Sequence, residues 1–407
     1  MDWPVLTIFL GVYCGLALGR LPGLALDRAA IAFVGAVLVL AFGKIGLAEA
    51  WAAIDVGTIA LLFGMMLVSV ELERAGFHER VASWIASSHV SPPRLVGLVV
   101  FVAGALSALL TNDVVCLALA PLVVDMAARR RLAPLPFLLA LAAGSNVGSA
   151  ATLIGNPQNM LIGERLNLDF GAYLAVAALP SALGLVATWA ILVALQRGRF
   201  DASFVPPPRP TREYRALRVH ALLAVLVGVV VLFLATDWPR ATVALGAGAL
   251  TLVSRTSRTS RTEDVLAGVD WSLLVLFAGL FVVNRAFESS GMLARAFAAA
   301  RDAGVDASDP ATLFLVTVPL SNLVSNVPAV MLLLPTATHK DAGAILALAS
   351  TLAGNLLLVG SIANLIVADQ AARLGLPFGW KEHARAGIPI ACATLAIAAA
   401  WLALRSL

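Results

Sequence analysis

Long apolar runs recur along the whole of this 407-residue chain. Runs such as Trp3 to Gly19, Ala172 to Leu195 and Ala221 to Leu234 approach the roughly 20 residues that a helix needs to cross a bilayer. Hydrophobic residues make up 60% of the chain and charged residues 13%, about half the charge of a soluble domain. The sequence therefore predicts an all-α, multi-pass protein of a cell membrane, which is the inner membrane if the source is bacterial.

The chain matches itself when its second half is laid over its first. Residues 55–76 align with residues 270–291, and residues 106–121 align with residues 320–335. Matching of this kind indicates a duplicated unit. The matched pairs are Asp55 with Asp270, Gly64 with Gly279, Glu73 with Glu288, Gly76 with Gly291, Ser107 with Ser321, Asn112 with Asn326 and Pro121 with Pro335.

The basic residues fall in the short connections between apolar runs, where they report topology. With residues 95–128 and 311–335 taken as re-entrant hairpins, 20 of the 28 Lys and Arg residues lie on one face. That face is predicted to be cytoplasmic, and both termini are then predicted outside. Each half has five crossings, an odd number, so the second half must run upside down. The predicted fold is two inverted-topology repeats, each with about five transmembrane helices and one re-entrant hairpin.

This topology divides the chain into three segments. Residues 1–196 form the first inverted repeat, residues 197–218 form a cytoplasmic Pro/Arg-rich linker, and residues 219–407 form the second inverted repeat. After each hairpin a single crossing is expected, at residues 135–163 and at residues 343–366. Glycines in these crossings would let the backbone unwind or let another element approach, namely Gly144, Gly148, Gly155, Gly354 and Gly360.

The tip of each hairpin is predicted to break its helix. Thr111, Asn112 and Asp113 interrupt the first hairpin, and Ser325 and Asn326 interrupt the second, shortly before a proline. A break at membrane depth leaves half-helix N-termini with free N–H groups and unwound carbonyls that suit a small cation. A Na⁺ site is therefore expected here. Its expected ligands are Ser107, Thr111, Asn112, Ser321, Ser325 and Asn326.

A second polar surface follows each hairpin. Gly155 to Asn159 in the first half aligns, after a gap, with Gly360 to Asn364 in the second half. Short amide and hydroxyl side chains here are expected to line a central chamber together with the hairpin tips, and close helix packing by small residues is the alternative. The substrate- and ion-binding residues predicted in this surface are Asn146, Asn156, Gln158, Asn159, Asn355, Ser361 and Asn364.

Asp113 is an ionisable group at predicted membrane depth, which is costly and marks a functional candidate. Its counterpart in the second half is Val327, so a single hairpin carries a titratable group, as suits coupling to H⁺ or Na⁺. The alternative is that Asp113 caps the following half-helix. Glu73 and Glu288 are expected to be structural, and Asp369 is interpreted as a loop carboxylate rather than part of an exit path.

At these motifs the sequence resembles the ion transporter superfamily of arsenite pumps, sodium/proton antiporters and divalent anion/sodium symporters. The resemblance covers most of the chain and favours the arsenical pump and anion-permease branch. It rests on residues 111–113, 144–160, 325–328 and 354–370. It implies a scaffold domain, a transport domain with an elevator-like movement, and a homodimer. The dicarboxylate branch holds carboxylates with paired Ser-Asn-Thr tips, and the final hydroxyl is missing from both tips here.

The leading hypothesis is a secondary active transporter that moves a small anion or oxyacid, such as arsenite, coupled to H⁺ or Na⁺. A sodium/proton antiporter with Asp113 as the exchange site is the alternative. An intramembrane enzyme is disfavoured because the chain has no HExxH or GxSxG motif. A primary pump is disfavoured because the chain has no phosphate loop, although an ATPase subunit on a separate chain stays open.

The expected partners are the transported solute, membrane lipid and a second copy of the chain, and no nucleic acid. Cys14, Cys116 and Cys392 lie singly in apolar runs, without the spacing of a zinc site or a disulfide framework. No cofactor is therefore expected beyond a coupling ion, Na⁺ or H⁺.

Overall fold

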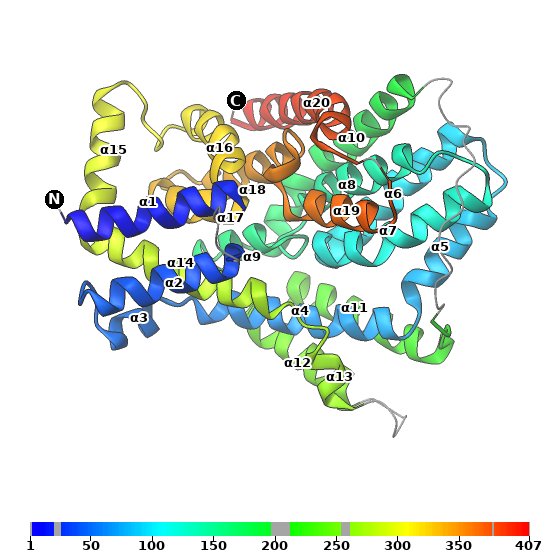
Figure 1. Ribbon diagram of the computed structural model, residues 1–407, viewed down its shortest axis with the longest axis horizontal. Helices are drawn as coiled ribbons and strands as arrows, with labels where there is room; N and C mark the ends of the chain where they lie inside the picture. Colours follow the sequence, from blue (N-terminus) through cyan, green and yellow to red (C-terminus); the bar gives the residue numbers. More distant parts are fainter. Residues whose placement is uncertain (1, 20–25, 197–211, 254–260, 377, 407) are drawn as a thin grey trace.

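The computed structural model describes residues 2–19, 26–196, 212–253, 261–376 and 378–406, and every regular element in these ranges is a helix (Figure 1). The all-α prediction is confirmed. Six of the described helices are long and apolar enough to cross a membrane. Most of the predicted linker, residues 197–211, lies outside the described residues. Helix α11 begins at Ala216, so the last residues assigned to the linker are helical instead, at the start of an apolar run.

The two halves contain the same order of helices. The first half comprises α1 (Trp3–Leu18), α2 (Arg28–Ala41), α3 (Leu47–Ala53), α4 (Val56–Arg74), α5 (Phe77–Ser87), α6 (Pro92–Leu109), α7 (Asn112–Arg129), α8 (Leu135–Ser149), α9 (Pro157–Arg165) and α10 (Phe170–Leu195). The second comprises α11 (Ala216–Ala235), α12 (Arg240–Val253), α13 (Thr262–Leu266), α14 (Trp271–Ser289), α15 (Met292–Asp302), α16 (Pro310–Val324), α17 (Asn326–Leu333), η1 (Leu334–Thr336), α18 (Ala342–Ala353), η2 (Leu358–Gly360), α19 (Ile362–Arg373) and α20 (Trp380–Ser406).

Residues matched in the sequence alignment have matched structural roles. Asp55 and Asp270 are the N-caps of α4 and α14, where their carboxylates accept hydrogen bonds from backbone N–H groups at 2.8 Å and 3.0 Å. The counterpart helices α5 and α15 lie at opposite ends of the long axis of the molecule (Figure 1). The orientation of each half in the membrane stays a prediction.

Each half packs its second helix against the fourth helix of the other half, α2 on α14 and α12 on α4. The matched glycines make these contacts close. A Cβ atom on Gly64 would lie 2.4 Å from the backbone of Ala244, and one on Gly279 would lie 2.7 Å from the backbone of Ala32. Helix backbones this near to each other leave no room for a side chain. We call α1–α4 with α11–α14 the flanking region.

The remaining long helices, α6–α10 and α16–α20, pack mainly on one another and form what we call the central region. Its hairpins are α6–α7 and α16–α17, close to the predicted ranges 95–128 and 311–335. Both predicted helix breaks are confirmed. Thr111 is the extended N-cap of α7, and Ser325, with φ of 77° and ψ of 158°, separates α16 from α17.

The single crossings predicted at residues 135–163 and 343–366 are each broken in the middle. Helix α8 ends at Ser149 and α9 starts only at Pro157, while α18 ends at Ala353 and α19 starts at Ile362. The α9 break has a local cause, since Asn156 caps the backbone N–H of Asn159 at 2.9 Å and Pro157 lacks an N–H to extend the helix backwards. Irregular backbone is tolerated before α9 because residues 152–156 are buried in protein.

Three carboxylates outside the hairpins each form an ion pair. Glu73 pairs with Arg212 at 2.8 Å and Glu288 pairs with Arg285 at 3.5 Å, which agrees with the structural role expected for both. Asp369 lies inside α19, so its interpretation as a loop carboxylate was wrong. The helix continues through Asp369 to Arg373, and a side-chain ion pair one turn apart supports it there.

Replacing Gly64 with valine should destabilise the protein, because the new side chain would push α12 away from α4. Overpacking of this kind costs about 1–3 kcal/mol. We expect the melting temperature of the detergent-solubilised protein to fall by several degrees. Gly246→Val in α12 is the matched control, because a Cβ atom there meets nothing within 4 Å. Equal losses in the two variants would contradict the packing argument.

Candidate substrate and ion site

Asn146 of α8 lies at the centre of a buried polar network. Its side-chain oxygen accepts hydrogen bonds from Asn112 at 3.1 Å and Ser361 at 2.9 Å. Its amide nitrogen donates to Asn355 and Asn364, both at 2.9 Å. The amide therefore uses its full hydrogen-bonding capacity, and it joins two helices of the first half to both ends of the break that precedes α19.

Thr351 of α18 is the centre of a second part of the network. Its hydroxyl accepts hydrogen bonds from Asn156 and Gln158, both at 3.2 Å, and donates to Asn159 at 3.3 Å. Asn156 also donates to the Ser149 hydroxyl at 3.0 Å. The break before α9 is thus tied to the second half of the chain, as the break before α19 is tied to the first.

Both hairpin tips reach these breaks. The backbone N–H of Asn112 donates to the Gly155 carbonyl at 3.0 Å. With its amide nitrogen turned toward the carbonyls, Asn326 donates to Gly360 at 3.0 Å and Ser350 at 3.1 Å, and accepts from Gln158 at 3.2 Å. The two tips and the two breaks therefore meet in one place, and all seven predicted residues of the second polar surface lie there buried.

Several polar atoms at this place are buried without a hydrogen-bond partner in the described part of the chain. They include the matched hydroxyls of Ser107 and Ser321, and Asn112 Oδ1. Buried polar groups are normally paired, so these oxygens are available to a ligand. The described residues contain no cluster of His, Cys, Asp and Glu that could hold a metal ion. Neutral oxygens of this kind suit a hard monovalent cation such as Na⁺ rather than zinc.

The hairpin-tip residues differ in burial and in the hydrogen bonds that their side chains make. Thr111 is buried and Ser325 is half-buried, and neither side chain makes a hydrogen bond to another described residue. Asp113 is half-buried in the first turn of α7, and its carboxylate has no hydrogen bond or ion pair with the described residues. The predicted alternative, a capping hydrogen bond from Asp113, is therefore absent from the described contacts, although the helix N-terminus still favours its negative charge.

Two residues that contact the asparagines of the network were not predicted from the sequence. Tyr173 of α10 accepts from Asn159 at 3.2 Å and donates to the Ala150 carbonyl at 2.7 Å. His383, at the matching place in α20, is 2% exposed and lies 3.1 Å from the Asn355 carbonyl and 3.5 Å from the Asn364 amide. They were missed because a tyrosine and a histidine do not align as a pair, and both stand near the ends of apolar runs.

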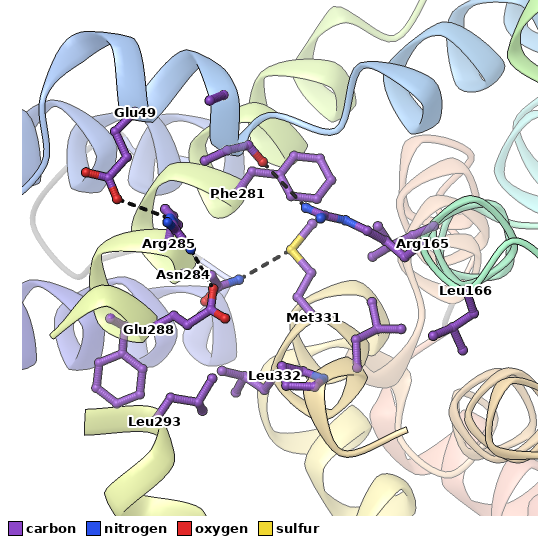
Figure 2. Close-up of a pocket in the computed structure, with 16 residues that line it drawn as sticks. Glu49, Arg165, Leu166, Phe281, Asn284, Arg285, Glu288, Leu293, Met331 and Leu332 are labelled. Atoms are coloured by element: carbon purple, nitrogen blue, oxygen red, sulfur yellow. Dashed lines mark hydrogen bonds and ion pairs between the residues drawn. The ribbon is translucent and has the colours of Figure 1, made fainter. Parts of the chain in front are cut away.

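A crevice of about 560 Å³ lies beside the site, between the flanking and central regions. Figure 2 shows Arg285 and Arg165 on opposite sides of it, with Phe281 and Met331 between them. Helices α9 and α17 carry site residues at their N-terminal ends and line the crevice with their later turns. None of the predicted site residues lines it, so this crevice adjoins the site without containing it.

Broken helices around a buried polar centre, in an all-α fold with apolar spans, define a multi-pass membrane transporter. The chain belongs to the citrate transporter family CitMHS, whose family model matches residues 13–345. The predicted resemblance to arsenite- and citrate-type transporters is confirmed, and the family is one of transporters rather than enzymes.

The chain is similar to two named transporters and to one solved structure over 90% or more of each chain. The chain is 31% identical to the transporter Rv2684 of Mycobacterium tuberculosis, over 100% of this chain and 99% of that protein. It is 30% identical to the silicon efflux transporter LSI3 of Oryza sativa subsp. japonica, over 90% of each chain. The crystal structure of the YdaH transporter from Alcanivorax borkumensis has the same fold, with a TM-score of 0.58, 16% identity and 98% coverage of both chains.

Truncating Asn146 to alanine should destabilise the protein, because several buried polar groups lose their partner at once. A buried group left unpaired costs about 1–3 kcal/mol. We expect a clear drop in the melting temperature of the purified protein. Gln196→Ala, which removes an amide from the half-exposed C-cap of α10, is the control and should change little. A melting temperature unchanged by Asn146→Ala would show that the network contributes nothing to the fold.

Proposed function

We propose that this protein is a secondary active transporter that moves a small oxyacid or monovalent anion through the site around Asn146, coupled to H⁺ or Na⁺. The observation that carries the proposal is the convergence of two hairpin tips and two helix breaks on one buried polar centre. Binding sites of secondary transporters are built from interrupted helices of this kind.

The chemistry of the site favours a solute with little charge. Amides and hydroxyls form the network, and no Lys or Arg is among its residues. A multiply charged carboxylate would be buried there without a fixed counter-charge, at a high desolvation cost. A neutral hydroxide such as arsenous or silicic acid offers hydroxyl donors and acceptors that match amide side chains. The name of the rice relative, a silicon efflux transporter, supports the same class of solute.

The coupling ion has two candidate sites. Asp113 is suited to carry a proton, because its carboxylate lies at a hairpin tip without a fixed partner among the described residues. The unpaired oxygens of Ser107, Ser321 and Asn112 are suited to Na⁺. We assign Asp113 the proton-coupling role and keep the six predicted Na⁺ ligands as the alternative site.

For the transport movement we propose an elevator, in which the central region slides along the flanking region. The two regions meet through few helix pairs, mainly α9 on α4, α17 on α14 and α16 on α1. A contact limited in this way suits sliding better than a deeply interdigitated one. A homodimer built on the flanking region completes the proposal, with membrane lipid around both copies.

Transport by purified protein in liposomes tests the substrate class. Under an imposed pH or Na⁺ gradient we expect uptake of arsenite or silicic acid, and little uptake of citrate. Labelled Na⁺ is measured in parallel. Na⁺ exchanged for H⁺ without any oxyacid or anion flux would replace this proposal with a sodium/proton antiporter.

Replacing Asp113 with asparagine should abolish flux driven by the pH gradient, because the amide keeps the shape of the side chain but cannot exchange a proton. The variant should still fold, as judged by its elution and melting temperature. Asp302→Asn, at an exposed position at the end of α15, is the matched control and should transport normally. Full proton-driven flux in Asp113→Asn would remove this residue from the coupling mechanism.

A further inference from the structure

Arg28 and Arg240 occupy the same place in the two halves. Each is the first residue of the second helix of its half, α2 or α12. One turn later, Ala32 and Ala244 make the matched glycine contacts with α14 and α4. The two arginines therefore stand at equivalent points of the flanking region, each facing the central region.

Glu164 and Asp369 are equivalent in the central region. Asn159 and Asn364 are the matched asparagines in the first turn of α9 and of α19. Glu164 follows Asn159 at the same spacing as Asp369 follows Asn364. Each carboxylate thus lies toward the C-terminal end of the half-helix that leaves the site.

On one side of the molecule the matched groups are joined. Arg240 Nε lies 2.8 Å from Glu164 Oε1, and the guanidinium also donates to the carbonyls of Gly163 and Leu168. Next to this pair, Arg165 Nε lies 2.8 Å from the carboxylate of Asp55. The C-terminal end of α9 is therefore held in a socket formed by the starts of α12 and α4.

On the other side the equivalent socket has no occupant from α19. Arg28 makes one long hydrogen bond, 3.5 Å to the Val359 carbonyl, while its Nε and Nη1 are shielded from solvent without a partner among the described residues. Arg28, Asp270 and Ser272 line a cavity of about 430 Å³. Asp270 and Ser272 align with Asp55 and Gly57 of the filled socket.

The alignment of the two halves also shows which position in the Arg28 socket corresponds to Glu164 in the Arg240 socket. In the filled socket, Glu164 lies against the start of α4, since a Cβ atom on Gly57 would be 2.9 Å from Glu164 Oε2. In the other socket, Ser272 of α14 lines the cavity at that place. A carboxylate entering there would meet Nε and Nη1 of Arg28, which have no partner in the described part of the chain, and this is favourable for a charge-assisted pair.

Asp369 is outside this cavity but on the correct face of α19. Ile362 and Leu365 line the cavity, and Asp369 continues their helical spacing. It lies about 10 Å beyond Ile362 along the helix, at 1.5 Å per residue. In this conformation it pairs with Arg373 at 2.8 Å on the exposed surface, a weak type of contact that is easily given up.

We propose that Arg28, Asp270 and Ser272 form a docking socket that receives Asp369 in the opposite-facing conformation, when Glu164 leaves Arg240. The proposal rests on the elevator movement proposed above. Sliding α19 along its axis by about 10 Å brings Asp369 to Arg28. The same movement draws α9 out of its own socket. Gln370, which stands where α9 has Arg165, would then donate to Asp270.

Cysteine cross-linking tests the two sockets directly. In a Cys14→Ser, Cys392→Ser background, a short bifunctional thiol reagent should join the pair Arg240→Cys with Glu164→Cys, because the linker replaces the length of two side chains that touch in this conformation. The pair Arg28→Cys with Asp369→Cys should also cross-link, and locking either pair should prevent the other from forming. Cross-linking of the first pair without the second would overturn the proposal.

Charge exchange tests the ion pair itself. Arg28→Asp and Asp369→Arg should each lower flux about fivefold or more, and the double exchange should restore flux to within about twofold of the parent. Arg373→Gln is the control, because it removes the partner of Asp369 in this conformation only, and should not lower flux. No rescue in a correctly folded double variant would also overturn the proposal.

The two proposals can fail separately. Cross-linking needs no substrate, so the sockets can be verified even if no oxyacid is transported. Absence of flux in the parent protein would count against the proposed function alone. A parent that transports normally while the Arg28 and Asp369 pair never meets would count against the docking socket alone.

Discussion

The structure depends on the need of every buried backbone group for a hydrogen-bond partner. A helix satisfies this need by itself, and a helix broken in the middle of an apolar protein does not. Here an asparagine beside each break donates to its open carbonyls, Asn364 to Gly354 and Asn159 to Thr152, and the other half of the chain holds these asparagines in place. Asn146 of the first half binds Asn355, Ser361 and Asn364 around the break before α19, and Thr351 of the second half binds the residues around the break before α9.

This mutual support between the two halves makes the polar centre both a structural and a binding element. The Asn146 amide has all its hydrogen bonds, which favours one arrangement of the side chains around it. The oxygens of Ser107, Ser321 and Asn112 are left out of the network, within the described residues. Fixed surroundings and a few free ligand atoms are the conditions that a selective site needs, because ligands that are already held in place lose little freedom when an ion binds.

The sequence predicts the parts of this site that are repeated in it. The hairpin tips, the Asn-rich blocks and the matched serines were found because similar residues stand at matched positions. The glycines of the two crossings indicated that the backbone could unwind there, but the apolar residues around them hid where the breaks before α9 and α19 begin and end. Tyr173 and His383 were missed because different chemistry does the same task in each half. Arg28 and Arg240 were counted as topology signals, and their partners became visible only in three dimensions.

A duplicated chain need not be symmetric at any moment. Both halves contain the same socket and the same half-helix, yet one socket is filled, and the other is lined by Arg28, which has no ion pair with the described residues. If the two pairings exclude each other, moving from one conformation to the other exchanges one buried ion pair for another, and the free energies of the two states stay close. The occupants differ, however, since α9 offers Glu164 and Arg165 where α19 offers Asp369 and Gln370. That difference provides one more charge pair on the α9 side, which favours the conformation in which α9 is docked.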